Sequence, residues 1–206
     1  MEQLPKKRMW LPSPGFLVFL GFLLVFAAIA IPGVLSAKRA SNERTAATML
    51  AMLRNAEADF RTNDWDGNKV NDFWTGDVSG LRYVVSAETK AQVKLIDITQ
   101  ADADSKPLLP LPKGTLPMMG YFFMALDRDD NCKGAEGEYK TDTDKSGRKV
   151  HHEKKFGFCA FPKNGWAGKH VFRVNETNTI FRQPGTEPGN SFPDNAELKS
   201  HWSPLN

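Results

Sequence analysis

The chain has 206 residues, a length typical of a single domain, with 27 lysines and arginines against 24 aspartates and glutamates. The first 35 residues hold three of these basic side chains and one of the acidic ones, which leaves 24 against 23 for the other 171. This even mixture argues against the clustered basic face of a nucleic-acid-binding protein, so no nucleic acid is expected as a partner. Residues 16–31 read FLVFLGFLLVFAAIAI without a polar side chain. The residues that follow this apolar segment therefore form a hydrophilic domain.

The apolar segment predicts a membrane-spanning helix. Residues 16–35 supply the roughly 20 residues that a helix needs to cross a hydrocarbon core about 30 Å thick. Pro32 is compatible with this prediction because membrane helices tolerate proline better than soluble ones do. The basic cluster Lys6-Lys7-Arg8 precedes the segment. It favours a cytoplasmic N-terminus and a C-terminal domain on the other side of the membrane.

A secretory signal peptide is the alternative interpretation. A basic start, an apolar stretch and small residues around Ala37 are typical of signals as well as of anchors. Cleavage near Ala37 would release a soluble protein outside the cytoplasm. A size shift of an N-terminal fusion on maturation would distinguish the two.

A helical pattern continues beyond the apolar segment. No glycine or proline occurs between Val34 and Thr62, so one long helix is predicted from about residue 16 to about residue 61, kinked near Pro32. Its outer half has a single apolar stripe, which must pack on another element. The stripe consists of Ala46, Met49, Leu50, Leu53, Ala56 and Phe60.

The remainder is predicted to form short strands. The fold class is α+β, with a long N-terminal transmembrane helix packed on a small antiparallel β-sheet. Residues 175–178, Asn-Glu-Thr-Asn, are typical of a hairpin turn. Residues 107–117 are a proline-rich connector, and the charged residues 127–155 are expected at the surface. Candidate strands are 81–86, 93–98 (or a short helix), 121–126, 156–161, 171–174 and 179–182.

Two stretches carry a resemblance to a known family. Residues 27–32, AAIAIP, followed by 35–43, LSAKRASNE, resemble the N-terminal helix of type IV pilins and type II secretion pseudopilins. Residues 63–77, NDWDGNKVNDFWTGD, together with 156–162, FGFCAFP, and 171–181, VFRVNETNTIF, are similar to pilin-like proteins of planctomycete type. The predicted organisation is then a basic leader (1–15), a transmembrane and extended amphipathic helix (16–62) and a pilin-like globular β domain (63–206).

This resemblance implies a structural or minor subunit of a type IV pilus or type II secretion-type assembly. Its partners would be the membrane, other pilin-like subunits or secretion machinery, and prepilin peptidase if the leader is processed. Its location would be the bacterial inner (cytoplasmic) membrane, single-pass, with a periplasmic or extracellular C-terminal domain. It would not be an enzyme. The sequence also contains no G-x-S-x-G motif and no phosphate-binding glycine loop.

The family pattern places leader cleavage between Gly15 and Phe16. The family also has a glutamate at the fifth mature position, where this chain has Leu20, and no acid occurs anywhere in the span. That glutamate normally pairs with the terminal amine of a neighbouring subunit. Its absence keeps a second function open, a membrane-tethered periplasmic binding module that does not polymerise and is stabilised by calcium.

Cys132 and Cys159 are the only cysteines. Outside the cytoplasm an even number of cysteines favours a disulfide, as pilins often have in their C-terminal region. A bridge here would enclose 26 residues and stabilise the fold by about 3 kcal/mol. The alternative is two free thiols, with Cys159 buried in its strand and Cys132 in a loop.

Residues 64–72, DWDGNKVND, resemble a calcium-binding loop. Asp64, Asp66, Asn68 and Asp72 would supply oxygen ligands to Ca²⁺, the one cofactor that the sequence suggests. The loop departs from the EF-hand pattern because Lys69 stands where that pattern has glycine. The alternative is a turn rich in Asn, Asp and Gly that ends the helix.

The triplet His151-His152-Glu153 could suggest a metal site. Adjacent residues of a strand point apart and the spacing of a zinc motif is missing, so a surface position is predicted instead. Aromatic residues are numerous enough to form the core of a small domain.

Overall fold

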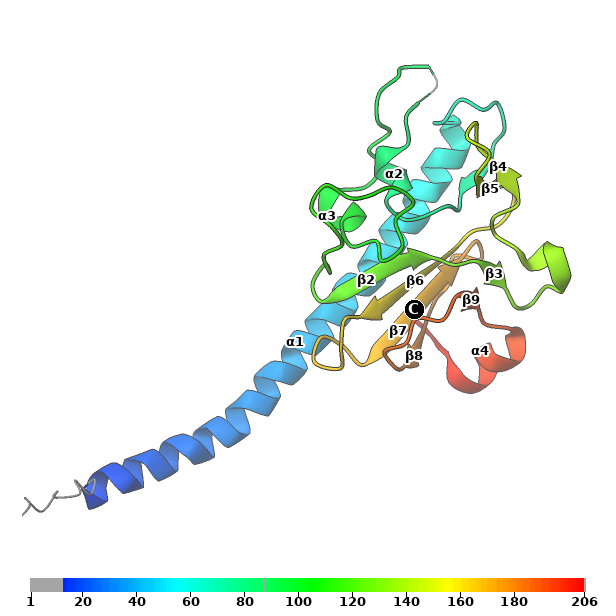
Figure 1. The fold of residues 1–206 in the computed structure, drawn as a ribbon. Coiled ribbons are helices and arrows are strands. Elements are labelled where there is room, and N and C mark those ends of the chain that lie inside the picture. The colour runs from blue at the N-terminus through cyan, green and yellow to red at the C-terminus, as the bar shows by residue number, and fades with distance from the viewer. Residues whose placement is uncertain (1–12, 87, 206) are drawn as a thin grey trace, which may run out of the picture. The chain divides into compact units, whose positions relative to one another are not determined.

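The computed structural model describes residues 13–86 and 88–205, so the predicted basic cluster Lys6-Lys7-Arg8 lies outside the described residues. The chain divides into two compact units, Met1–Lys38 and Arg39–Asn206. Helix α1, Pro14–Asn63, contributes to both (Figure 1). Its bounds confirm the predicted long helix, with Pro32 inside it. Backbone amides of the first turn bond to Ser13, whose side chain and carbonyl accept from Phe16 and Leu17.

The second unit is built on a five-stranded antiparallel sheet in the order β10-β8-β7-β6-β2. It confirms an α+β fold in which a long helix packs on an antiparallel sheet. The predicted turn at 175–178 joins two neighbouring strands of this sheet. Its strands are β2 (Tyr121–Ala125), β6 (Gly157–Pro162), β7 (His170–Asn175), β8 (Ile180–Pro184) and β10 (Ser203–Leu205).

One face of the sheet covers the apolar stripe of α1. Leu50, Leu53 and Phe60 are fully or almost fully buried against strand residues such as Phe123 and Phe158. Alternation along the strands sends the intervening side chains to the opposite face. There a second cluster forms beneath α4 (Asn195–His201), with Met124, Leu126, Tyr139, Cys159, Val171, Phe192 and Trp202. The sheet is therefore buried on both sides.

Smaller elements lie around the large sheet, and α2, β4 and β5 are those near the end of α1 (Figure 1). A three-stranded antiparallel sheet has the order β1-β5-β4 and a parallel pair joins β3 to β9. The bounds of these elements are β1 (Phe73–Trp74), α2 (Gly80–Tyr83), α3 (Ile98–Ala101), β3 (Arg128–Asp129), η1 (Gly134–Gly137), β4 (Asp142–Thr143), β5 (Lys149–His152) and β9 (Ser191–Phe192).

Two strand predictions were wrong. Residues 81–86 begin inside α2, and 93–98 end where α3 begins. The two segments are joined by one isolated bridge, between Val85 and Gln92, and by backbone hydrogen bonds from residues 93–95 to residues 81, 82 and 84. These contacts do not form a regular strand. The prediction that 127–155 lies at the surface was also wrong in part, because Tyr139, Val150 and His151 are buried.

Candidate functional site

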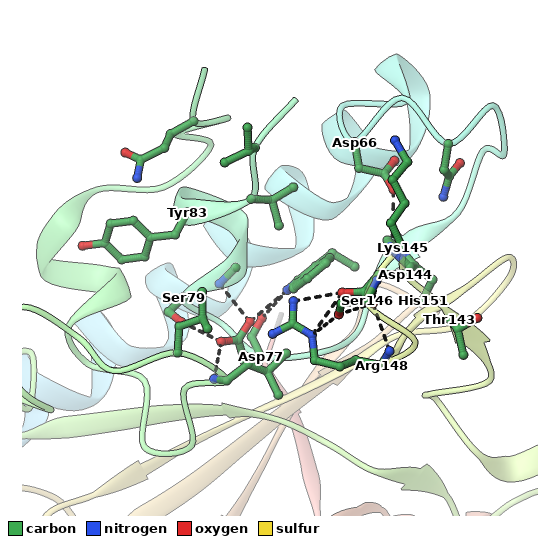
Figure 2. A pocket seen from close by; sticks show the side chains of 18 of the residues that line it. Asp66, Asp77, Ser79, Tyr83, Thr143, Asp144, Lys145, Ser146, Arg148 and His151 are labelled. Atoms are coloured by element: carbon green, nitrogen blue, oxygen red, sulfur yellow. Dashed lines mark hydrogen bonds and ion pairs between the residues drawn. The ribbon is translucent and has the colours of Figure 1, made fainter. Parts of the chain in front are cut away.

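The domain contains a pocket of about 690 Å³ beside the end of α1. One wall is apolar and comes from α2, the two valines after it and the proline-rich segment 108–112. The other wall is polar and comes from the loop after α1, the turn between β4 and β5, and β5 itself. Figure 2 shows Tyr83 and Ser79 on one side of the pocket and Lys145, Asp144 and His151 on the other. Pockets of this size with a mainly apolar lining are typical of ligand sites.

The carboxylate of Asp77 fixes the floor of the pocket (Figure 2). Its Oδ1 accepts hydrogen bonds from Trp74 Nε1 and the Gly80 amide, both near 3 Å, and its Oδ2 accepts from Ser79 Oγ at 2.6 Å and the Leu108 amide at 2.8 Å. A carboxylate bonded by four donors is structural, because no lone pair remains for a substrate. Asp77 therefore ties α2 to the proline-rich segment.

Asp104 reinforces this junction. It is fully buried, and its two oxygens accept from the amides of Ser79 and Lys106 at 2.8 and 2.9 Å. Burial, together with the charge of Asp77, raises the pKa of Asp104 to about 6 in spite of these hydrogen bonds. The pocket floor consequently rests on a buried acid whose protonation changes below neutral pH.

The turn between β4 and β5 places a cation at the pocket. Asp144 organises the turn by accepting bonds from the backbone and side chains of Ser146 and Arg148. Burial opposes ionisation of Asp144, but these donors lower its pKa below its usual range. Arg148 is thereby neutralised, whereas Lys145 lines the pocket without an ion pair among the described residues.

His151 lies at the back of the polar wall and is almost completely buried, so its predicted surface position was wrong. Its ring stacks on Phe60 with a centroid distance of 6.3 Å and meets Trp74 edge-on at 5.3 Å. Nδ1 lies 3.4 Å from Asp72 Oδ1, and Nε2 lies 3.6 Å from Asp66 Oδ2. Burial acts to lower the pKa of His151, but the two carboxylates outweigh it and raise this pKa above its ordinary value.

The four predicted calcium ligands do not form a metal site. Asp64 caps the amides of Asn68 and Lys69 at 3.1 and 3.0 Å, and Asn68 bonds to the Val70 amide and to Asp72. Nothing in residues 13–86 and 88–205 gathers three His, Cys, Asp or Glu side chains in metal-binding geometry. The hydrogen bonds of the loop are those of the alternative turn, and Asp66 and Asp72 face the imidazole of His151.

Cys132 and Cys159 are free thiols in the structure, so the predicted disulfide is not formed. Cys159 points into the cluster beneath α4, where its thiol lies 3.4 Å from the Pro188 carbonyl and burial raises its pKa to about 11. Cys132 follows β3, and its sulfur lies 2.9 Å from Lys155 Nζ. Side chains alternate along β6, and this alternation sends Cys159 to the face of the sheet away from α1. The spacing of the two cysteines does not reveal this direction.

The predicted cleavage residues, Gly15 and Phe16, lie in the first turn of α1. A side chain at Gly15 would meet nothing within 4 Å, so this turn is open on the side of that glycine. Phe16 is about half exposed, as are the apolar residues that follow it. Across the described ranges, 13–86 and 88–205, α1 is the one helix long and apolar enough to cross a membrane.

The polar groups of the pocket are mostly engaged by other groups of the domain. The acids are bonded by backbone amides or paired with His151, and Ser79 donates its proton to the saturated Asp77. Asp66 Oδ1 is buried without a partner and lines the pocket. The hydroxyl of Tyr83 is likewise buried without a partner in the lining. An apolar wall, the cation of Lys145 and these unpartnered polar atoms suit a ligand with an apolar body and a polar end. This site was not foreseen, because its walls come from four segments far apart in the sequence.

Comparisons with protein-family models, with curated proteins and with solved structures find no match to this chain in any of the three.

Proposed function

We propose that the protein is a membrane-anchored, pilin-like or pseudopilin-like subunit, structural or minor, of a type IV pilus or type II secretion-type assembly. One observation carries the proposal: the exposure of apolar side chains changes along α1. Its first part is apolar around its whole circumference and exposed, whereas its second part buries a stripe against the antiparallel sheet. An exposed apolar helix requires lipid or other apolar helices around it. A filament core and a membrane both supply these surroundings.

The mature N-terminus tests this proposal. The full chain is produced together with a prepilin peptidase, and mass spectrometry of the purified protein is expected to find Phe16 at the N-terminus. Gly15→Leu should abolish processing. Gly21→Leu is the matched control, since neither glycine has an atom within 4 Å of its Cβ position and neither change disturbs packing. An intact Met1 in the presence of active peptidase contradicts the proposal.

A second candidate is a membrane-tethered periplasmic binding module that does not polymerise. The pocket favours it, because a subunit that only assembles has no need of a pocket of about 690 Å³ with an apolar wall. Native mass spectrometry of the full chain from its membrane is expected to show a bound small molecule. Leu109→Asp, on the exposed part of that wall, should remove the molecule, and Val70→Asp, equally apolar but outside the lining, should not.

A further inference from the structure

The connection between β6 and β7, residues 163–169, is anchored to the first residues of α1 that belong to the domain. Asn42 Nδ2 donates to the Ala167 carbonyl at 2.8 Å, and Glu43 Oε1 accepts from the Lys169 amide at 2.8 Å. Figure 1 shows this connection beside α1. The loop is therefore held in a defined position at the end of the domain opposite to the pocket.

This loop presents an exposed tryptophan. Trp166 is 67% exposed and belongs to neither buried cluster, and the Arg39 guanidinium lies over its ring, 5.3 Å from the centroid. Met119, 54% exposed, adjoins the loop through Gly120, whose Cβ position lies 2.8 Å from Ala167 Cβ. The packing of the domain gives no reason for an exposed tryptophan beside an exposed methionine.

The charge around Trp166 is positive. Arg39, Lys163 and Lys169 are in no ion pair within the part of the chain that the structure describes, and residues 163–169, KNGWAGK, include no acid. The neighbouring acid, Glu43, is occupied by the Lys169 amide and by His170, 3.0 Å away. One cation thus lies over the aromatic ring, and two more lie on the loop that carries it.

The chain keeps this surface close to the apolar segment. Only three residues separate Arg39 from Leu35, the end of the apolar run, so their Cα atoms lie within about 14 Å of each other in any conformation. Tryptophan concentrates at the boundary between lipid and water, and arginine and lysine are attracted to anionic head groups. Both kinds of side chain occur where the chain would leave a bilayer.

We propose that the surface formed by Arg39, Met119, Lys163, Trp166 and Lys169, the Trp166 surface, binds the anionic head-group layer of the membrane that holds residues 16–35. Trp166 enters this layer, and the three cations contact phosphates. The domain is thereby held against the membrane instead of moving freely on its helix. The proposal rests on the membrane anchor in the proposed function but not on assembly into a filament.

The test uses the full chain labelled with 5-fluorotryptophan in nanodiscs that contain phosphatidylglycerol. Trp166→Phe assigns the Trp166 fluorine resonance, and the buried Trp74 and Trp202 serve as internal references. A lipid with a nitroxide at its head group is expected to abolish the Trp166 signal and leave the references visible. A water-soluble gadolinium chelate should spare the Trp166 signal. The reverse pattern would overturn the proposal and would fit a surface that binds another protein.

Charge variants sharpen the test. The triple variant Arg39→Gln, Lys163→Gln, Lys169→Gln should restore the Trp166 signal beside nitroxide lipid. The matched triple Lys133→Gln, Lys149→Gln, Lys154→Gln, which removes as much charge from exposed sites elsewhere, should not. If the chain does not enter nanodiscs, this result would contradict both the proposed membrane anchor and this proposal. A chain that enters but keeps its Trp166 signal would contradict this proposal alone.

Discussion

The two parts of α1 differ in where their apolar side chains lie. Residues 14–38 expose theirs around the whole helix, whereas residues 39–63 expose polar groups and bury one stripe against the sheet. The first part has no tertiary partner within the described chain, so its stability depends on its surroundings. The second part is a core element of the domain. One helix thus combines an exposed apolar segment, long enough to cross a membrane, with a scaffold of the domain, and each part can be disturbed separately.

The largest effect is expected from truncating one leucine in each part. Leu50→Ala removes a fully buried side chain and should cost about 3–4 kcal/mol of the free energy of unfolding. Leu23→Ala, the same substitution at a residue 51% exposed, should leave the unfolding of the domain unchanged. Urea unfolding in detergent, followed by near-ultraviolet circular dichroism, measures both. Equal losses from the two variants would contradict the division of α1.

The pH dependence of stability should come from the domain alone. Residues 14–37 contain no ionisable side chain, whereas the domain holds the buried Glu57, Asp104 and His151 and the partly buried Asp66, all with pKa values raised by folding. The folded chain therefore holds more protons than the unfolded chain above pH 4, and its stability falls as pH rises. For Asp104, a pKa of about 6 against an unfolded value of about 3.9 corresponds to a loss of about 2 kcal/mol between pH 4 and 7.

Asp104→Asn should flatten this part of the pH profile, and the unfolding midpoint at pH 4.5 and at pH 7.5 measures it. The variant also loses one acceptor for a backbone amide, so its stability at pH 4.5 should be lower than that of the wild type. An unchanged slope between the two pH values would show that Asp104 ionises in the fold as it does in the unfolded chain.

A smaller effect, at higher pH, is expected from His151. Because its folded pKa is raised by Asp72 and Asp66, its stabilising contribution is complete below about pH 6.5 and lost as pH rises through the folded pKa. His151→Gln should lower the free energy of unfolding more at pH 6 than at pH 9. The same loss at both pH values would mean that the ring acts by packing alone. His152→Gln, at the half-buried neighbour, is the control.

The prediction from sequence succeeded where the pattern is local. Helix α1 and four of the five strands of the large sheet follow from local patterns such as the apolar runs YFFMA in β2 and GFCAF in β6, whereas β10 was not predicted. It failed at β5, because Val150 is the only apolar residue in KVHH and the burial of His151 depends on Phe60 and Trp74. It also did not foresee that two of the proposed calcium ligands, Asp66 and Asp72, lie beside that imidazole. Both the burial of His151 and the position of these acids depend on contacts between residues far apart in the sequence. The spacing of residues along the chain does not predict such contacts.

The smallest effect is expected at the two cysteines. As free thiols they leave the fold without a covalent link, so Cys132→Ser at its half-exposed site should change stability by no more than about 0.5 kcal/mol. Denatured, unreduced protein should react with two equivalents of a thiol reagent. A loss near 3 kcal/mol together with no reactive thiol would instead indicate the bridge that the sequence suggested.

The central claim is that the first part of α1 is a membrane anchor and the second part a scaffold within a folded domain. Flotation of the full chain with liposomes after an alkaline wash tests this claim most directly. The wild type should remain with the lipid at every pH examined. Leu23→Asp should be extracted, since a central acid costs a spanning helix about 3 kcal/mol, and Leu50→Ala should be retained. A wild-type chain that is washed off and stays monodisperse without detergent would contradict the claim.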